Sequence, residues 1–197
     1  KKDVGEFTFV AVGDTQGVTW NGTTTSTKGY MYAMAAIHEA FEEVKDPAFI
    51  LHAGDVVETG NNKNMWNMYF KALGDFGTRT PMFVTMGNHD ARFFFKKNSK
   101  TVIDKVDKYL DIKTDGKTYY SYDVNGYTFV VMCTEKRVLE KAYISEEQMK
   151  FIDSELARGT KDGKPVFLMC HQPFANTHGL PEVWETGDLG EQNDEVR

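Results

Sequence analysis

Five polar side chains of the kinds that bind divalent cations occur directly after apolar runs of the chain. They are the carboxylates of Asp14 and Asp55, the amides of Gln16 and Asn88, and the imidazole of His171. Oxygen and nitrogen donors without thiolate suit hard to borderline divalent metals such as Mn, Fe or Zn. The sequence therefore predicts a metal site built from these five residues.

A carboxylate can bridge two cations, so this donor set is able to hold a pair of ions. Two ions about 3.5–4 Å apart can clamp a phosphate and activate a water between them as hydroxide. Taken singly, a Gly-Asp pair after a strand is usually a turn. Four polar clusters that each follow an apolar run are hard to explain as four independent turns. The glycines beside them, Gly13, Gly54 and Gly87, allow tight turns that leave room for ions and substrate.

The elements that must position these residues are strands alternating with helices. Two segments with apolar residues at three- and four-residue spacing, 30–44 and 63–76, predict amphipathic helices between the first three apolar runs. The four runs expected to be strands are Phe7–Val12, Phe49–Ala53, Met82–Met86 and Val166–Cys170. Near-continuous apolar strands alternating with helices predict a parallel sheet, and ligands bind outside the carboxyl ends of such strands. We therefore expect the four polar clusters to meet at one rim.

The later part of the chain has a different pattern. Two β-rich segments, 119–124 and 127–134, are joined by Asn125-Gly126, a strong hairpin signal that predicts a second sheet or an antiparallel edge. Ser145 followed three residues later by Gln148 is typical of a helix start, and the helix is expected to end near Arg158.

Composition limits the classes of function. A length of 197 residues favours one domain, and 41% hydrophobic with 26% charged residues is typical of a globular protein. The net charge of −6 argues against a nucleic acid polymer as partner. No apolar run approaches the ~20 residues that a membrane span needs. Cys133 and Cys170 lie in apolar runs and are expected to be buried thiols. The basic start followed by a strand favours a mature secreted or cell-surface protein, with a cytoplasmic location as the alternative.

The motifs G-D-T-Q, G-D-V-V-E-T-G, G-N-H-D and C-H-Q-P, in this order, resemble those of the calcineurin-like metallophosphoesterases. This superfamily includes the purple acid phosphatases, and the resemblance covers nearly the whole chain. It implies an α/β fold in which two mixed β-sheets pack as a sandwich flanked by helices. It also implies hydrolysis of a phosphate monoester or diester, on a small molecule or nucleotide, by a hydroxide held between two divalent metal ions.

The resemblance carries roles onto the predicted metal ligands. Asp14 would bind the first metal, Asp55 would bridge both, and Asn88 and His171 would bind the second. Gln16 stands where many members of the superfamily have histidine, and a neutral amide oxygen is a weaker donor than an imidazole.

Further roles concern catalysis and substrate. His89 would contact the phosphate and protonate the leaving oxygen, and Asp90 would orient its imidazole, as a carboxylate beside histidine generally does. Arg92 and His178 are candidates to bind substrate. His52, inside an apolar run, is expected to be a packed core residue.

Two departures from the pattern remain. Glu58 stands where many members have aspartate, at a position that usually does not touch metal. No G-H-x-H motif, which supplies one histidine to each metal in the family, follows His171. We therefore expect residues 1–197 to form a single metallophosphoesterase domain whose C-terminal part lies beyond Arg197.

Two other classes of function fit parts of the pattern. A catalytically weak module could use the same fold to recognise a phosphate or a partner, although a binder has little use for the acid-base residue of G-N-H-D. A nucleotide-binding Rossmann domain fits the alternation of strands and helices, but no G-x-G-x-x-G is present.

Overall fold

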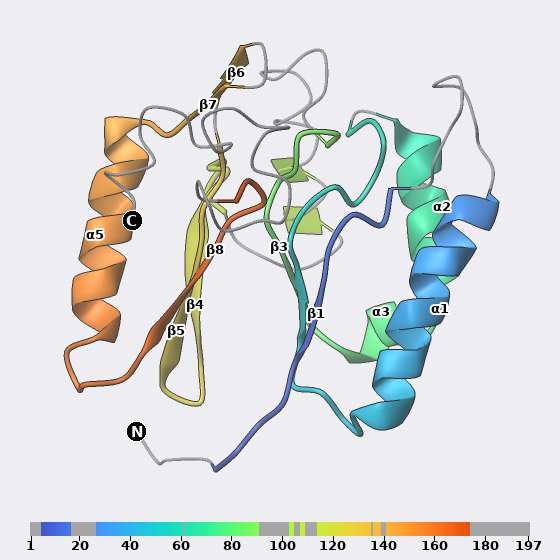
Figure 1. Ribbon diagram of the computed structural model, residues 1–197, viewed down its shortest axis with the longest axis horizontal. Helices are drawn as coiled ribbons and strands as arrows, with labels where there is room; N and C mark the ends of the chain where they lie inside the picture. Colours follow the sequence, from blue (N-terminus) through green and yellow to red (C-terminus); the bar gives the residue numbers. More distant parts are fainter. Residues whose placement is uncertain are drawn as a thin grey trace.

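Two β-sheets form the centre of the protein, and helices cover their outer faces (Figure 1). The computed structural model describes residues 5–16, 27–60, 62–90, 103–104, 107–108, 114–134, 136–138 and 141–173. In Figure 1, α1, α2 and α3 lie on one side of the sheets and α5 lies on the other. This arrangement confirms the expected α/β sandwich.

The first sheet is parallel, with the order β1-β2-β3. Its strands are β1 (Val10–Val12), β2 (Ile50–His52) and β3 (Met82–Val84). Val10 pairs with Ile50, and Ile50 pairs with Met82, so the three strands start in register. All three therefore end at the same edge, as expected for the first three apolar runs.

Helices α1 (Thr27–Glu43), α2 (Lys63–Leu73) and α3 (Phe76–Arg79) accompany this sheet. The Asn62 side chain caps α2 by accepting hydrogen bonds from two backbone N–H groups of the first turn. The helix ends at Gly74, whose φ of +60° is a conformation that glycine adopts without strain. The segment expected as one helix over 63–76 is therefore divided here, and α3 begins two residues later.

The second sheet has the order β4-β5-β8 and mixes two kinds of pairing. Strands β4 (Tyr120–Val124) and β5 (Tyr127–Val131) form the predicted antiparallel hairpin. Strand β8 (Val166–Met169) pairs parallel to β5. The fourth apolar run thus lies in the second sheet, and the rim expected from one sheet is shared by two. A short third sheet pairs β6 (Lys136–Val138) with β7 (Lys141–Tyr143).

Helix α5 (Glu146–Gly159) connects β7 to β8 and covers the second sheet. Ser145 caps it, as predicted, by accepting a hydrogen bond from the backbone N–H of Gln148. The Gln148 side chain bonds both backbone groups of Cys133, donating to its carbonyl and accepting from its N–H, each at 2.8 Å. These bonds attach the start of α5 to the segment after β5.

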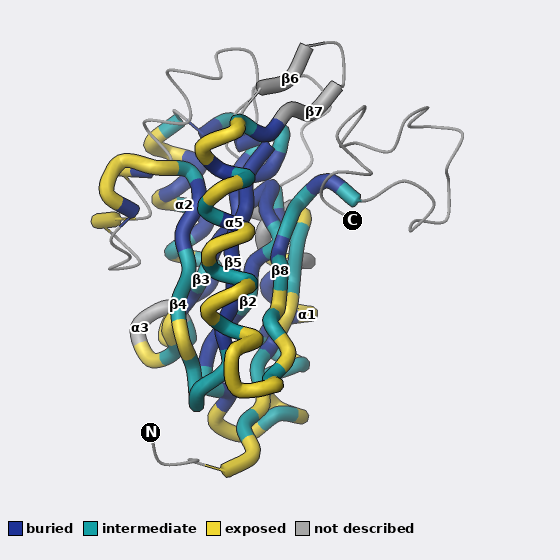
Figure 2. Tube along the Cα trace, turned by 90° about the vertical axis from the view of Figure 1, so that its left-hand side faces the viewer, coloured by how far each residue is buried: buried dark blue, intermediate teal, exposed yellow. Residues whose placement is uncertain are grey.

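Aromatic side chains fill the space between the two sheets. Phe49 and Phe129 meet edge to face with ring centroids 5.0 Å apart, and Tyr122 stacks on Phe129 at 5.1 Å. Figure 2 shows the strands buried in the middle of the molecule and the outer face of α5 exposed.

Cys133 is buried and Cys170 is half-buried. Among the described helices, none is both long and apolar enough to cross a bilayer.

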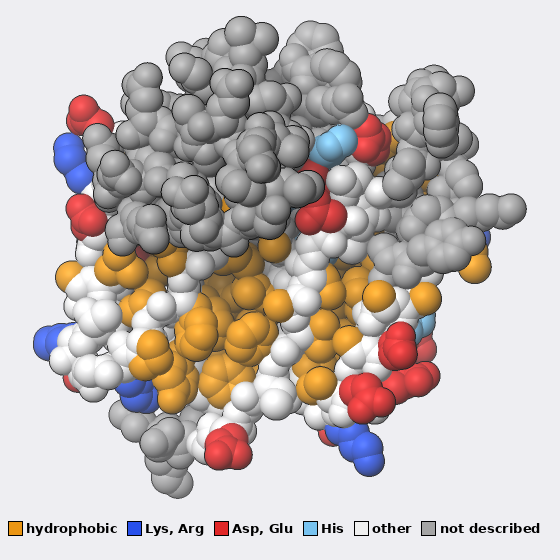
Figure 3. Space-filling view, in the orientation of Figure 1, with side chains coloured by type: hydrophobic (Ala, Val, Ile, Leu, Met, Phe, Trp, Pro, Cys, Tyr) orange, Lys and Arg blue, Asp and Glu red, His pale blue; other side chains and the backbone are white. Residues whose placement is uncertain are grey.

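An apolar hollow of about 900 Å³ lies at the amino-terminal ends of the two edge strands β1 and β8. Apolar side chains gather on the face of the molecule shown in Figure 3. Phe7 and Phe9 line the hollow from the first sheet, and Tyr127 and Phe167 line it from the second. The polar clusters follow the carboxyl ends of the same strands, so the hollow lies at the opposite end of the sandwich.

Candidate metal centre

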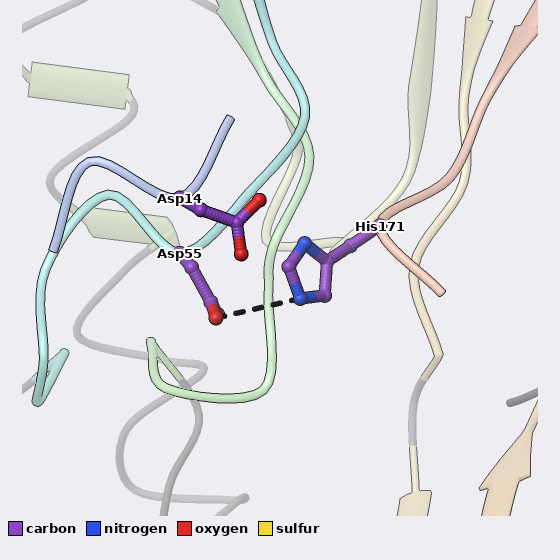
Figure 4. Close-up of side chains that lie close together, drawn as sticks. All are labelled: Asp14, Asp55 and His171. Atoms are coloured by element: carbon purple, nitrogen blue, oxygen red, sulfur yellow. Dashed lines mark ion pairs between the residues drawn. The ribbon is translucent and has the colours of Figure 1, made fainter. Parts of the chain in front are cut away.

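Three of the predicted ligands converge where the two sheets meet. Asp14 follows β1, Asp55 follows β2 and His171 follows β8. One donor atom from each lies within 4.8 Å of the other two. In Figure 4 the three side chains point toward a common centre, although they come from distant parts of the sequence. This spacing allows the three atoms to share one cation.

Asp55 occupies the middle of the cluster, and its carboxylate is almost completely buried. Its Oδ1 accepts a hydrogen bond from the backbone N–H of His89 at 2.8 Å. Its Oδ2 accepts one from the Gln16 amide at 3.1 Å and lies 3.5 Å from Nε2 of His171. One oxygen therefore holds the loop that carries His89, and the other faces Gln16 and His171.

The His171 imidazole has its tautomer set by the backbone. Nδ1 lies 2.7 Å from the carbonyl oxygen of Ala53, which can only accept, so Nδ1 is the donor. In the neutral ring the lone pair is then on Nε2, 2.9 Å from Oδ1 of Asn88 and 3.5 Å from Oδ2 of Asp55. A nitrogen lone pair that faces two oxygens in this way suits a divalent cation.

Gln16 brings a further oxygen to the cluster. Its Nε2 donates to Asp55, while its Oε1 is buried and has no hydrogen-bond partner among the described residues. A buried carbonyl oxygen without a partner is costly unless a cation or a donor satisfies it. All five residues predicted as ligands therefore lie together, and their chemistry fits a pair of divalent metals.

The loops that carry Asp14 and Asp55 are joined through their backbones. The N–H of Asp14 donates to the carbonyl of Gly54, and the N–H of Gln16 donates to the carbonyl of Asp55. Both aspartates have left-handed backbone conformations, with φ of +56° and +53°. Such a conformation costs a non-glycine residue about 1–2 kcal/mol. The surrounding hydrogen bonds hold this strain at the two candidate ligands.

Two glycines allow the loops to approach one another closely. A Cβ atom on Gly87 would overlap Oδ1 and the backbone nitrogen of Asp55. Gly54 has a φ of +95°, and a Cβ there would lie 2.8 Å from Nδ1 of His171. Gly13 has more room, since a Cβ there would lie 3.3 Å from that of Ala53. The predicted role of glycine is therefore strongest at Gly54 and Gly87.

His89 lies beside the cluster, and its orienting partner differs from the one expected. Its Nδ1 is 2.8 Å from Oε2 of Glu58, and its Nε2 is 3.8 Å from Oδ2 of Asp55. Glu58 thus makes the imidazole contact that we expected of Asp90. An acid three residues after a ligand, in a loop that turns back over the site, is the sequence signal that could have indicated this pair.

Asp90 is instead a structural residue that joins two loops. Its buried carboxylate accepts hydrogen bonds from the backbone N–H groups of Val56 at 3.3 Å, Val57 at 3.0 Å and Gly87 at 2.9 Å. Burial, and then the charge of Asp55, raise the pKa of the Asp90 carboxyl to about 7, while the three N–H groups oppose that rise. Asp90 therefore supports the site by holding the backbone of the two loops that carry Asp55 and Asn88.

His52 is the packed core residue that we expected. It is fully buried, its Nδ1 accepts from the backbone N–H of Gly54, and its Nε2 lies 2.9 Å from Oγ1 of Thr15. The Thr15 hydroxyl in turn donates to the carbonyl of Val56. Burial first, and the charge of His171 second, lower the pKa of His52 to about 3. The ring is therefore neutral at physiological pH.

Electrostatics around Asp14 follow from its place in the cluster. Burial is the largest influence and raises the pKa of its carboxyl, as does the charge of Asp55, while His171 and His89 lower it. A bound cation reverses this balance, because it favours the charged carboxylates.

Arg92 and His178, the two candidate substrate-binding residues, lie outside the described residues.

Comparison with known proteins agrees with this geometry. The sequence model of the family described as calcineurin-like phosphoesterase matches residues 7–195. Purple acid phosphatase 22 of Arabidopsis thaliana is 22% identical over 183 residues, covering 88% of this chain and 37% of that protein. The structure of purple acid phosphatase PPD1 from seeds of yellow lupin (Lupinus luteus) has the same fold, with a TM-score of 0.63 and 17% identity over 94% of this chain and 34% of that one. The chain thus spans about a third of the length of these relatives.

Proposed function

The chain belongs to the calcineurin-like phosphoesterase family, and from this premise we propose that it hydrolyses phosphate esters with a pair of divalent metal ions. The observation that carries the proposal is the convergence of Asp14, Asp55 and His171 within 4.8 Å. The substrate class is a phosphate monoester or diester on a small molecule or nucleotide.

The residues proposed to hold the ions are the five described above. Asp55, Asp14 and Gln16 would hold one ion, and Asp55, Asn88 and His171 would hold the other. Divalent ions at such a site neutralise the charge of the phosphoryl oxygens and lower the pKa of water, which makes hydrolysis feasible at neutral pH.

His89 is proposed as the residue that moves a proton. Its Nε2 faces the cluster, within 3.8 Å of Asp55, so it can reach the oxygen that leaves phosphorus. Its Nδ1 bonds the Glu58 carboxylate at 2.8 Å, which holds the ring in one orientation and stabilises a positive charge on it. Glu58 is thus a positioning residue, which acts through His89.

The test compares three variants of the full chain with Mn²⁺ and an aryl phosphate. Asp55→Asn should lose bound metal and at least a hundredfold of the hydrolysis rate. His89→Ala should keep its metal, measured by elemental analysis, while kcat falls about 10²–10⁴-fold. Asp75→Asn, the same chemical change at an exposed carboxylate remote from the cluster, should match the wild type. Hydrolysis at the normal rate in Asp55→Asn would reject the proposal.

The binding-module alternative makes a different prediction for the same samples. Wild-type protein that holds phosphate but no metal, and hydrolyses nothing, would favour a recognition role over catalysis.

A secreted or cell-surface location stays a prediction, which fractionation of the producing cells would check.

A further inference from the structure

A chain of buried hydrogen bonds connects the loop after β1 with the loop after β2. The N–H of Gly54 donates to Nδ1 of His52 at 3.3 Å, so the lone pair of the neutral ring is on Nδ1 and the hydrogen is on Nε2. Nε2 then donates to Oγ1 of Thr15 at 2.9 Å. The Thr15 hydroxyl donates its own hydrogen to the carbonyl oxygen of Val56, 3.3 Å away. The direction of every bond in the chain is therefore fixed.

This chain of bonds surrounds the backbone of the candidate ligands. It begins on the residue before Asp55 and ends on the residue after it. Its middle member, Thr15, lies between the candidate ligands Asp14 and Gln16. Both aspartates have left-handed backbone conformations, which persist only where the surrounding structure fixes them. The chain of bonds thus acts where the relative position of the two loops sets the distance between the carboxylates.

Burial makes the contact between His52 and Thr15 costly to break. His52 is fully buried and Thr15 is 3% exposed. A buried polar group that loses its partner retains the cost of its desolvation, so the loops would shift to satisfy it. Backbone hydrogen bonds also join these loops, from the N–H groups of Asp14 and Gln16. The contact of Thr15 is the one that can be removed without changing a candidate ligand.

We propose that His52 and Thr15 are positioning residues for the metal centre, and that they set the separation of the Asp14 and Asp55 carboxylates through the loops that carry them. Groups directly behind metal ligands typically change metal affinity 10–100-fold when they are removed. A core histidine that only packs would instead change stability and leave metal affinity as it is. The inference rests on the proposed function, because it assumes that the two carboxylates hold metal.

The first experiment measures the affinity of the full chain for Mn²⁺ by isothermal titration. Thr15→Val removes the hydroxyl with little change in shape and should weaken binding about 10–100-fold. Thr15→Ser keeps the hydroxyl and should recover at least half of the lost binding free energy. Thr128→Val is the matched control, because the buried Thr128 hydroxyl donates to Asp123 within the second sheet. The control should keep the affinity and the Mn²⁺ electron paramagnetic resonance spectrum of the wild type, and Thr15→Val should change both.

A double-mutant cycle tests whether the two residues act through one contact. His52→Asn keeps an acceptor for the N–H of Gly54 near the position of Nδ1, but its side chain is too short to reach Thr15. The double variant with Thr15→Val should bind Mn²⁺ about as well as the weaker single variant, whereas independent effects would add. Circular dichroism checks each fold, and the Thr15 variants decide the outcome by themselves if His52→Asn does not fold.

Three results would overturn the inference and leave the proposed function standing. They are wild-type affinity in Thr15→Val, an equal loss in Thr15→Val and Thr128→Val, and additive losses in the double variant. A wild-type chain that binds no Mn²⁺ would overturn both the inference and the proposed function.

Discussion

At the scale of single residues, the Asp55 carboxylate shows how closely the site is packed. Its Oδ1 is held by the backbone N–H of His89, and its Oδ2 remains for Gln16 and His171. The two oxygens therefore contact different groups. This division depends on Gly87, because a side chain there would occupy the space that Oδ1 needs.

We expect Gly87→Ala to displace Asp55 and weaken metal binding at least tenfold. The new Cβ would overlap both the carboxylate and the backbone nitrogen of Asp55. Isothermal titration with Mn²⁺ measures the change. Gly163→Ala is the matched control, because Gly163 has a φ of +69° but open space for a Cβ. It should cost about 1–2 kcal/mol of stability through backbone strain and leave metal affinity unchanged. Equal affinity in both variants would contradict the packing argument.

The pair of Glu58 and His89 allows a second prediction. Glu58→Ala should lower kcat about 10–100-fold with little change in KM, because the imidazole loses the partner that orients it. Glu58→Gln keeps an acceptor for the Nδ1 hydrogen and should recover part of the rate. Steady-state kinetics on an aryl phosphate separate the two constants. A Glu58→Ala variant whose KM rises while kcat stays constant would assign Glu58 to substrate binding instead.

At the scale of elements, two buried side chains join segments that follow different strands. Asp90 connects the loop after β2 with the loop after β3, through three backbone N–H groups. Gln148 connects the start of α5 with the segment after β5. The bonds of Asp90 add to a backbone hydrogen bond that joins the ends of β2 and β3.

Asp90→Asn should destabilise the fold by about 1–3 kcal/mol, because an amide has one acceptor oxygen and its NH₂ group would face a buried N–H donor. Urea unfolding followed by circular dichroism gives the difference in free energy. Asp115→Asn, the same change at an exposed turn residue, is the control and should leave the transition midpoint where it is. A midpoint for Asp90→Asn equal to that of the control would show that the three bonds add nothing.

At the scale of the whole molecule, one buried histidine links stability to pH. The pKa of His52 is about 3 in the folded chain, against an ordinary value of 6.5. Between these values the unfolded chain binds more protons than the folded one, so stability falls as the solution becomes more acidic. The stabilising effect is complete above about pH 6.5 and is lost progressively toward pH 3.

We expect His52→Gln to remove much of this acid sensitivity, because glutamine does not titrate. Between pH 6.5 and pH 4, the wild type should lose about 3 kcal/mol more of its free energy of unfolding than the variant, at 1.36 kcal/mol per pKa unit. Urea denaturation at a series of pH values measures both curves. Curves that fall in parallel would exclude His52 as the source.

Much of the arrangement could be predicted from local patterns. Apolar runs that end in Gly-Asp, Gly-Asn or His indicated the loops that carry the candidate ligands, and the Asn125-Gly126 turn indicated the hairpin. The capping residue Ser145 marked the start of α5. Each of these signals is short-range, because turn and cap preferences depend on backbone conformations over a few residues.

The sequence by itself therefore determined the kinds of donor atom, their order, and the strand ends on which they lie. Only the tertiary structure decided that β8 belongs to the second sheet, that Glu58 and not Asp90 contacts the His89 imidazole, and that the Gln16 oxygen is buried. These outcomes depend on which segments pack together across the sandwich. Long-range packing leaves no local pattern in the sequence, whereas strands, turns and helix caps do.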